Sequence, residues 1–205
     1  MTALGSSPPR STGALERVIR RAGARRQEPG ERCELCSVPV PPGHRHMLDT
    51  ERGEVMCVCQ ACSLLFARDA ASEGHYRLVP RRRIRLPAVS TKALGVPVGL
   101  AFFVVRADGA VIAHYPSPAG ATQWEVDPQS WAEVLEHRPE LRTLVADVEA
   151  LLVNTARGQQ HHWIVPIDDC FRLVAVVRRE WRGLSGGSRV WPEIERLFAE
   201  LTEQC

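Results

Sequence analysis

Two closely spaced pairs of cysteines are the residues of this 205-residue chain that are best suited to chemistry. A tight turn in a C-x-x-C segment directs both sulfurs at one point, and two such turns facing each other can hold a metal ion tetrahedrally. The 22 residues between the pairs slightly exceed the usual spacing of roughly 15–20 residues, which suits a ribbon with a long hairpin between its turns. The spacing predicts a metal site made of Cys33, Cys36, Cys59 and Cys62.

This four-cysteine site is expected to be structural, because four thiolates fill every position of a tetrahedral ion and leave none for a substrate or an activated water. Zinc is the expected ion, and iron, as in rubredoxins, is the alternative. The segments "CELC" and "CQAC" lack the glycine and aromatic residues that tend to flank rubredoxin cysteines, which favours zinc. Metal binding at such sites is worth about 10–16 kcal/mol, enough to fold a small ribbon with little core of its own.

Three further metal-binding side chains, Cys57, His44 and His46, lie close to these pairs. If the stretch from Cys57 to Cys59 is a strand, the two cysteines share one face and Cys57 lies close to the ion. If "HRHML" is extended, His44 shares a face with His46. Cys57 could replace a ligand or sense redox state, and the histidines could replace a cysteine or form a second weak site with Cys57. A buried thiol and polar hairpin histidines are the commoner arrangements. We predict that none of the three bonds the ion, so that Cys57→Ala leaves the metal stoichiometry unchanged.

Two other segments resemble catalytic motifs but have simpler structural explanations. "HHWIVPIDDC" contains the types found in a cysteine–histidine–aspartate nucleophile, but Asp168 suits a helix N-cap and Cys170 the first turn of that helix. "WRGLSGGS" lacks the Lys-Ser/Thr ending of a phosphate-binding loop. We therefore expect no catalytic residues and no enzymatic activity. The candidates considered in the first segment are His161, His162, Asp168, Asp169 and Cys170.

Composition points to a soluble cytoplasmic protein. The hydrophobic content of 44% is ordinary, and a formal net charge of +2 gives no strong field that would select nucleic acid or a membrane. No apolar run approaches the roughly 20 residues that span a bilayer, and the N-terminus has no secretory apolar segment. In the cytoplasm, clustered cysteines indicate metal ligands rather than disulfides.

The chain divides into three predicted parts: a disordered tail and short basic helix over 1–30, a zinc-ribbon-like module over 31–70, and an α+β domain over 75–205. The basic helix carries arginines from Arg17 to Arg26 on one face. The segment "YRLVPRRRIRLP" predicts a charged edge strand whose arginines face water. Those arginines are Arg81, Arg82, Arg83 and Arg85.

Within the larger domain, apolar patterning predicts an antiparallel sheet followed by C-terminal helices. Residues 100–106 form a buried central strand, followed by a turn at Asp108-Gly109 and a second strand that ends in a loop, "YPSPAGAT". A helix begins near Asp127-Pro128; "RTLVADVEALLVN" is a helix or a helix and a short strand; "HHWIVPI" is a strand. The helix capped by Asp168 should bury Phe171, Val174, Val177, Arg178 and Trp181, and the last helix Val190, Ile194, Leu197, Phe198 and Leu201.

The chain resembles an uncharacterised, mainly actinobacterial domain-of-unknown-function family over roughly residues 31 to 200. The resemblance is carried by "CELCSVPVPPGHRHMLDTERGEVMCVCQACSLLF", "RLPAVSTKALGVPVGLAFFVV", "YPSPAGAT", "ALLVN", "VPIDDCFRLVAVVRREWRGLSGG" and "VWPEIERLF". That family is associated with gene clusters for [NiFe]-hydrogenases. The resemblance therefore implies an accessory role, with a hydrogenase subunit or maturation factor as the protein partner.

Three functions are compatible with these observations. The first is a non-catalytic zinc-binding accessory protein. The second is a rubredoxin-like iron electron carrier, and the third is a nucleic-acid-binding zinc-ribbon regulator, which is disfavoured because no aromatic platform alternates with the arginines. Nickel-insertion proteins of hydrogenases also carry paired C-x-x-C zinc sites, but this chain lacks their N-terminal histidine motif, which argues against nickel delivery by that mechanism.

Overall fold

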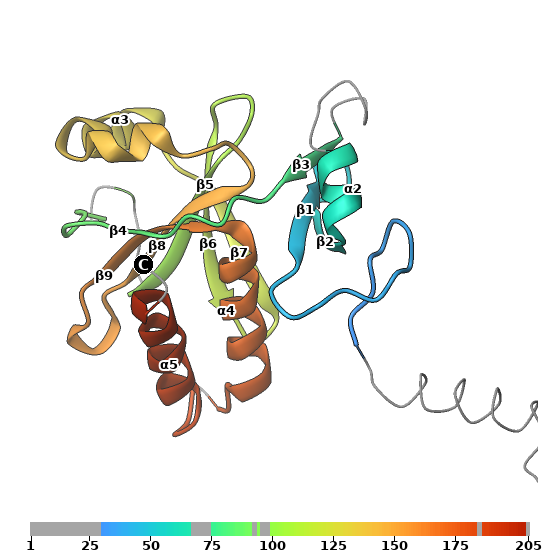
Figure 1. Ribbon diagram of the computed structural model, residues 1–205. Helices are drawn as coiled ribbons and strands as arrows, with labels where there is room; N and C mark the ends of the chain where they lie inside the picture. The colour runs from blue at the N-terminus through green and yellow to red at the C-terminus, as the bar shows by residue number, and fades with distance from the viewer. Residues whose placement is uncertain (1–29, 67–74, 92–93, 95–98, 184–185, 204–205) are drawn as a thin grey trace, which may run out of the picture.

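The computed structural model describes residues 30–66, 75–91, 94, 99–183 and 186–203, and they form two antiparallel sheets with helices packed on both (Figure 1). A three-stranded sheet has the order β2-β1-β3, and a six-stranded sheet has the order β4-β9-β8-β5-β6-β7. The α+β class, the antiparallel sheet and the C-terminal helices are confirmed. The predicted tail and basic helix, with Arg17 to Arg26, lie outside the described residues up to residue 29.

The small sheet is built on the hairpin of β1 (Arg45–Asp49) and β2 (Glu54–Val58), which lies between the two cysteine pairs as predicted. The carboxylate of Asp49 accepts hydrogen bonds from the amides of Glu51 and Arg52 and so fixes the turn. Helix α2 (Gln60–Leu65) begins directly after Cys59 and contains Cys62, the other member of the second cysteine pair. Strand β3 (Tyr76–Leu78) adds to β1, so this sheet also contains a strand from beyond residue 70.

Alternation along the hairpin gives the small sheet two different faces. Met47 and Val58 pack with Cys33 and Cys62 in a small core beneath α2. Leu48, one residue further along β1, instead joins the core of the larger domain. Because successive side chains point to opposite faces, residues of even number in β1 face the larger domain and those of odd number face the cysteine pairs.

The six-stranded sheet forms the centre of the larger domain, with helices on both faces. Alternate residues of its central strands pack against α4 and α5 on one face and against α3 on the other, as Phe102 and Phe103 do. Each face thus buries its own core. The strands are β4 (Ile84–Arg85), β5 (Leu100–Val105), β6 (Val111–Ser117), β7 (Gly120–Glu125), β8 (Glu149–Asn154) and β9 (His161–Pro166). The helices are α3 (Pro128–His137), η2 (Pro139–Thr143), η3 (Ala156–Gly158), α4 (Ile167–Glu180) and α5 (Val190–Glu203).

Several local predictions for this domain are confirmed. Strand β5 is buried in the middle of the sheet, the turn to β6 contains Gly109 at φ 88°, and β9 spans "HHWIVP". Asp127 caps α3 by accepting a hydrogen bond from the Ser130 amide at 2.8 Å. Helix α5 buries the five residues predicted for it.

Two other predictions were wrong. "YPSPAGAT" is not a loop, because β6 runs through Ser117 and turns directly into β7, where Ser117 pairs with Gly120. Helix α4 buries Ile167, Cys170, Leu173 and Val177, of which only Val177 was predicted, and leaves Phe171 39% exposed. For "RTLVADVEALLVN" the second alternative holds: the short η2 helix precedes the wholly buried β8.

Within the part of the chain that the structure describes, no helix is both long enough and apolar enough to cross a membrane.

His114 in β6 should make folding stability depend on pH. Its ring stacks on Phe102 at 4.6 Å between centroids, and burial, with a smaller effect of Arg106, lowers the pKa of His114 from 6.5 to about 4. The unfolded chain therefore binds a proton first as the pH falls, so stability is full above pH 6.5 and is lost between 6.5 and 4. At about 1.4 kcal/mol per pH unit the loss is roughly 2–3 kcal/mol.

The measurement is denaturant unfolding of the wild type and His114→Phe at pH 7 and pH 5. His114→Phe keeps an aromatic ring but cannot titrate, so it should lose less stability than the wild type on acidification. Because both proteins carry the same cysteines, any acid-induced metal loss affects them equally. Parallel pH dependences would contradict the assignment.

Candidate metal centre

The two cysteine turns face each other at one end of the small sheet. In the sequence, the first turn precedes the hairpin and the second follows it. In the first turn, the Ser37 amide donates to the Cys33 carbonyl at 2.7 Å and the Cys33 amide donates to the Val38 carbonyl at 2.8 Å. In the second, Cys59 is the N-cap of α2, and its sulfur accepts from the Cys62 amide at 3.4 Å. These local hydrogen bonds direct the sulfurs of each pair inward.

The four sulfurs come within 4.8 Å of one another, and the Cys36 and Cys59 sulfurs are 3.7 Å apart. A tetrahedral ion with metal–sulfur bonds of about 2.3 Å places its ligands about 3.8 Å apart. The observed separation fits that edge, so Cys33, Cys36, Cys59 and Cys62 could hold one metal ion. The cluster is compatible with a zinc-ribbon-like module.

Acid–base properties of the cluster suit a bound cation. Burial raises the pKa of Cys33, but hydrogen bonds from neighbouring backbone amides outweigh it and lower that pKa to about 6. Burial and the other three thiols raise the pKa of Cys62 far above its ordinary value. Once the Cys33 thiol is ionised, its negative charge therefore disfavours ionisation of the neighbouring thiols, unless a positive ion compensates their charge.

Cys57 does not join this cluster, because the stretch through Cys59 is not a strand and the condition for aligning the two cysteines is not met. Strand β2 ends at Val58 and Cys59 begins the helix, so the two sulfurs are not on one strand face. Cys57 instead forms a second group with His44 and His46, whose ligand atoms come within 4.8 Å of one another. Burial, followed by the charges of Glu31 and Glu34, raises the pKa of the Cys57 thiol.

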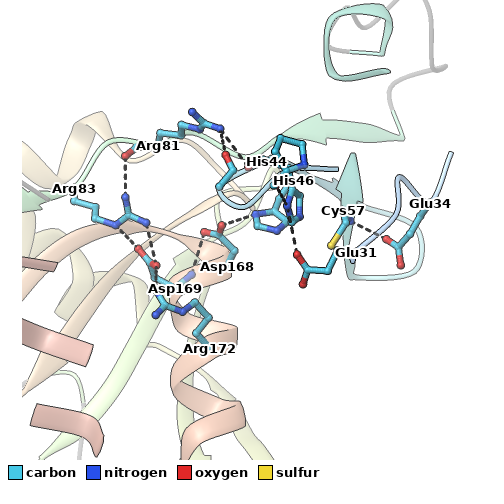
Figure 2. A network of polar contacts seen from close by, with 12 residues as sticks. Glu31, Glu34, His44, His46, Cys57, Arg81, Arg83, Asp168, Asp169 and Arg172 are labelled. Atoms are coloured by element: carbon cyan, nitrogen blue, oxygen red, sulfur yellow. Dashed lines mark hydrogen bonds and ion pairs between the residues drawn. The ribbon is translucent and has the colours of Figure 1, made fainter. Parts of the chain in front are cut away.

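Asp168 was predicted to cap a helix, and this was wrong. The N-cap of α4 is Pro166, and Asp168 lies in the first turn. Its carboxylate accepts a hydrogen bond from Nδ1 of His46 at 2.8 Å, across 122 residues of sequence (Figure 2). This contact joins the small sheet to the larger domain, and no local sequence pattern indicates it.

The arginines of the predicted edge strand are not simply solvated. Strand β4 is an edge strand as expected, but it contains only Arg85 of the four arginines. Arg83, which precedes it, donates two hydrogen bonds, of 2.7 and 3.1 Å, to the buried carboxylate of Asp169. Arg82 binds Glu149 in the same two-pronged manner, with both contacts at 2.6 Å. Arg81 donates to the carbonyls of Gly43 and His44. Three of the four arginines therefore make contacts that hold the chain together.

The candidates for a cysteine–histidine–aspartate nucleophile do not form one constellation. His162 is buried, and neither of its ring nitrogens has a hydrogen bond within the described residues. Cys170 is fully buried in the core, and burial raises its pKa well above the ordinary value. His161 stacks on Phe198, while Asp168 and Asp169 are held by His46 and Arg83. Residues adjacent in the sequence are thus directed to different parts of the fold.

Comparison with known proteins identifies a family for this chain but no individual relative. No curated protein and no solved structure matches it. Residues 32–205 match DUF5947, which is described as a family of unknown function. The match covers the cysteine cluster, the second histidine–cysteine group and the whole six-stranded sheet. The chain therefore belongs to the DUF5947 family of unknown function.

Proposed function

We propose that the protein is a non-catalytic zinc-binding accessory protein that acts through a protein partner in the cytoplasm. The proposal is carried by the 3.7 Å separation of the Cys36 and Cys59 sulfurs, which fits a filled four-thiolate site. An ion held in this way organises the chain and offers no position to a substrate. The zinc ion would hold the two cysteine turns against the hairpin, whose own core is small.

The partner that we propose is a [NiFe]-hydrogenase subunit or maturation factor. Its support is the resemblance of the cysteine segment and the later motifs to a family associated with hydrogenase gene clusters. A structural zinc module without a substrate position suits a protein that helps to assemble or support another metalloenzyme.

A genetic experiment tests this partner. Deletion of the gene is expected to lower hydrogenase activity or assembly, and a copy encoding Cys59→Ser should behave like the deletion, whereas the wild-type copy restores activity. Unchanged hydrogen oxidation in the deletion strain, with no hydrogenase component co-purifying with the protein, would remove the partner assignment. The zinc scaffold would still stand, because it rests on the cysteines.

Elemental analysis and a visible spectrum of the purified protein distinguish the proposed scaffold from an electron carrier. A colourless protein with one tightly bound zinc ion supports the scaffold. A coloured protein containing iron would instead support a rubredoxin-like function.

A further inference from the structure

We propose that His44, His46 and Cys57 form a second metal site, which binds a divalent first-row transition metal ion such as Zn²⁺ through two imidazole nitrogens and one thiolate. The inference goes beyond the proposed function, because three protein ligands leave one position of a tetrahedral ion open, unlike the four-cysteine cluster. The three side chains lie together on the face of the small sheet that meets α4 (Figure 2).

The β1–β2 ladder brings the three ligands together. His46 is directly opposite Cys57 in the ladder, and His44 precedes His46 by two residues on the same face. Side chains opposite each other in such a ladder have Cβ atoms about 4.5–5.5 Å apart. A tetrahedral ion needs its nitrogen and sulfur ligands about 3.3–3.6 Å apart. The ligand atoms, already within 4.8 Å, would reach this range by small side-chain rotations.

Hydrogen bonds leave the outer nitrogen of each histidine available to a metal. Nδ1 of His44 is 3.1 Å from the carbonyl oxygen of Pro41, which can only accept, so this nitrogen carries the proton. Nδ1 of His46 donates to the carboxylate of Asp168 at 2.8 Å. In both rings Nε2 therefore has a free lone pair. A carboxylate bound to the far nitrogen of a ligating histidine is a common arrangement that fixes the ring and strengthens its metal bond.

One of these nitrogens is buried without a partner. The side chain of His44 is only 5% exposed, and its Nε2 has no hydrogen bond within the described part of the chain. Leaving a buried polar atom unsatisfied costs about 1–3 kcal/mol, so such atoms are rare unless a water or an ion completes them. A metal ion between His44, His46 and Cys57 would satisfy this nitrogen.

The open position would face a cavity of about 1080 Å³ between the small sheet and α4. The cavity is lined by all three ligands and also by Arg81, Asp168 and Phe171. It has room for a water or a small exogenous ligand on the ion. One thiolate and two imidazoles suit zinc, cobalt or copper and not magnesium or calcium. Binding would release the Cys57 thiol proton as the sulfur–metal bond forms.

The four-cysteine cluster helps to position this second group. The amide of Glu34, inside the first cysteine turn, donates to the Cys57 carbonyl at 2.9 Å, and the Cys57 amide donates to the Glu34 carboxylate at 2.8 Å. Loss of the tightly bound ion would therefore disturb Cys57 as well. For this reason the second site has to be tested on protein that retains its tightly bound zinc.

The test is a titration of the reduced full-length protein with Co²⁺ after weakly bound metal has been removed by a chelating resin. One further equivalent of Co²⁺ should bind without release of zinc, with visible bands and a charge-transfer band from a single thiolate. His44→Ala and Cys57→Ala should abolish these bands while the tightly bound zinc remains. His75→Ala is the matched control. The imidazole of His75, the residue before β3 of the small sheet, pairs with Glu51, so its loss should leave the titration unchanged.

Asp168→Ala provides an independent test, since Asp168 lies on α4, outside the hairpin that carries the three ligands. Loss of a carboxylate behind a metal ligand should weaken Co²⁺ binding about 10–100-fold. Absence of a second equivalent in the wild type would overturn the proposal. So would a second equivalent that survives both His44→Ala and Cys57→Ala, because the ion would then be bound elsewhere.

Discussion

Substitution of Cys59 by serine is expected to release the tightly bound ion and to unfold the small sheet while the six-stranded sheet stays folded. The sulfur of Cys59 is one of the four candidate ligands, and the residue is also the N-cap of α2. Serine can still cap the helix, so the substitution removes the metal ligand and not the cap. The core beneath α2 contains only five buried residues, two of which are themselves cysteines of the cluster. Without about 10–16 kcal/mol from the metal, so small a core cannot offset the chain entropy of folding.

The chain offers a direct way to observe the two parts separately. All five tryptophans lie between residues 124 and 191, so their fluorescence reports only on the larger domain. Amide hydrogen exchange of β1 and β2 reports on the small sheet. In Cys59→Ser, exchange of these strands should become fast and the metal content should fall, while the tryptophan emission stays close to that of the wild type.

Cys57→Ala is the matched control, because the cysteine removed lies only two residues earlier in the chain. It should keep one tightly bound ion and slow exchange of the hairpin. The four-cysteine assignment would be refuted if each of Cys33, Cys36, Cys59 and Cys62 could be replaced without loss of metal. Iron in place of zinc would leave the ligands standing but would change the proposed role.

The cysteine cluster could be predicted from the sequence because its geometry is local. Each C-x-x-C pair forms its own turn through short-range hydrogen bonds, and the hairpin between the pairs brings the turns together. The same holds for the cap of α3 at Asp127 and for the apolar period of α5. In each case the signal lies within a few residues of the feature that it predicts.

Contacts between distant segments could not be predicted. The hydrogen bond from His46 to Asp168 joins two residues 122 positions apart, and an acidic residue at the start of a helix is read more simply as a cap. Helix α4 offers two apolar series, one through Phe171 and one through Cys170 and Leu173. Packing against the sheet selects the second, which no pattern within the helix can decide.

The histidine–cysteine group falls between these cases. Alternation along an extended "HRHML" predicts that His44 and His46 lie on one face. The turn between the strands decides which residue of β2 lies opposite His46. The turn from Thr50 to Gly53 places Cys57 there. The sequence therefore contained the ligands, but their convergence depended on a register that only the folded hairpin fixes.

Substitution of Arg82 by alanine is expected to destabilise the larger domain strongly. Glu149 is fully buried at the start of β8, and both of its oxygens accept hydrogen bonds from Arg82 at 2.6 Å. One of those oxygens also accepts from the Val145 amide at 2.9 Å. Removal of one member of a buried ion pair costs about 3–5 kcal/mol, because the remaining charge has no compensation.

The lower end of that range applies here. The Arg82 side chain is 39% exposed, so water can enter the space that it leaves and solvate part of the Glu149 carboxylate. A loss of about 3 kcal/mol should lower the midpoint of thermal unfolding by roughly 6–12 °C in a chain of this size. Tryptophan fluorescence during heating is the measurement. Arg85→Ala is the control, because this nearby arginine stacks at 6.0 Å over the Trp163 ring and is bound to no buried carboxylate among the described residues.

A double substitution separates the buried charge from the lost packing. Arg82→Met combined with Glu149→Leu removes both charges and keeps similar volume, so it should recover most of the stability that Arg82→Ala loses. If the cost came instead from the hydrogen bond of Arg82 to the Thr143 carbonyl, the double variant would stay as unstable as the single one. Equal stability of Arg82→Ala and Arg85→Ala would show that water solvates the Glu149 carboxylate when Arg82 is absent. The Arg82–Glu149 ion pair would then contribute little to the stability of the larger domain.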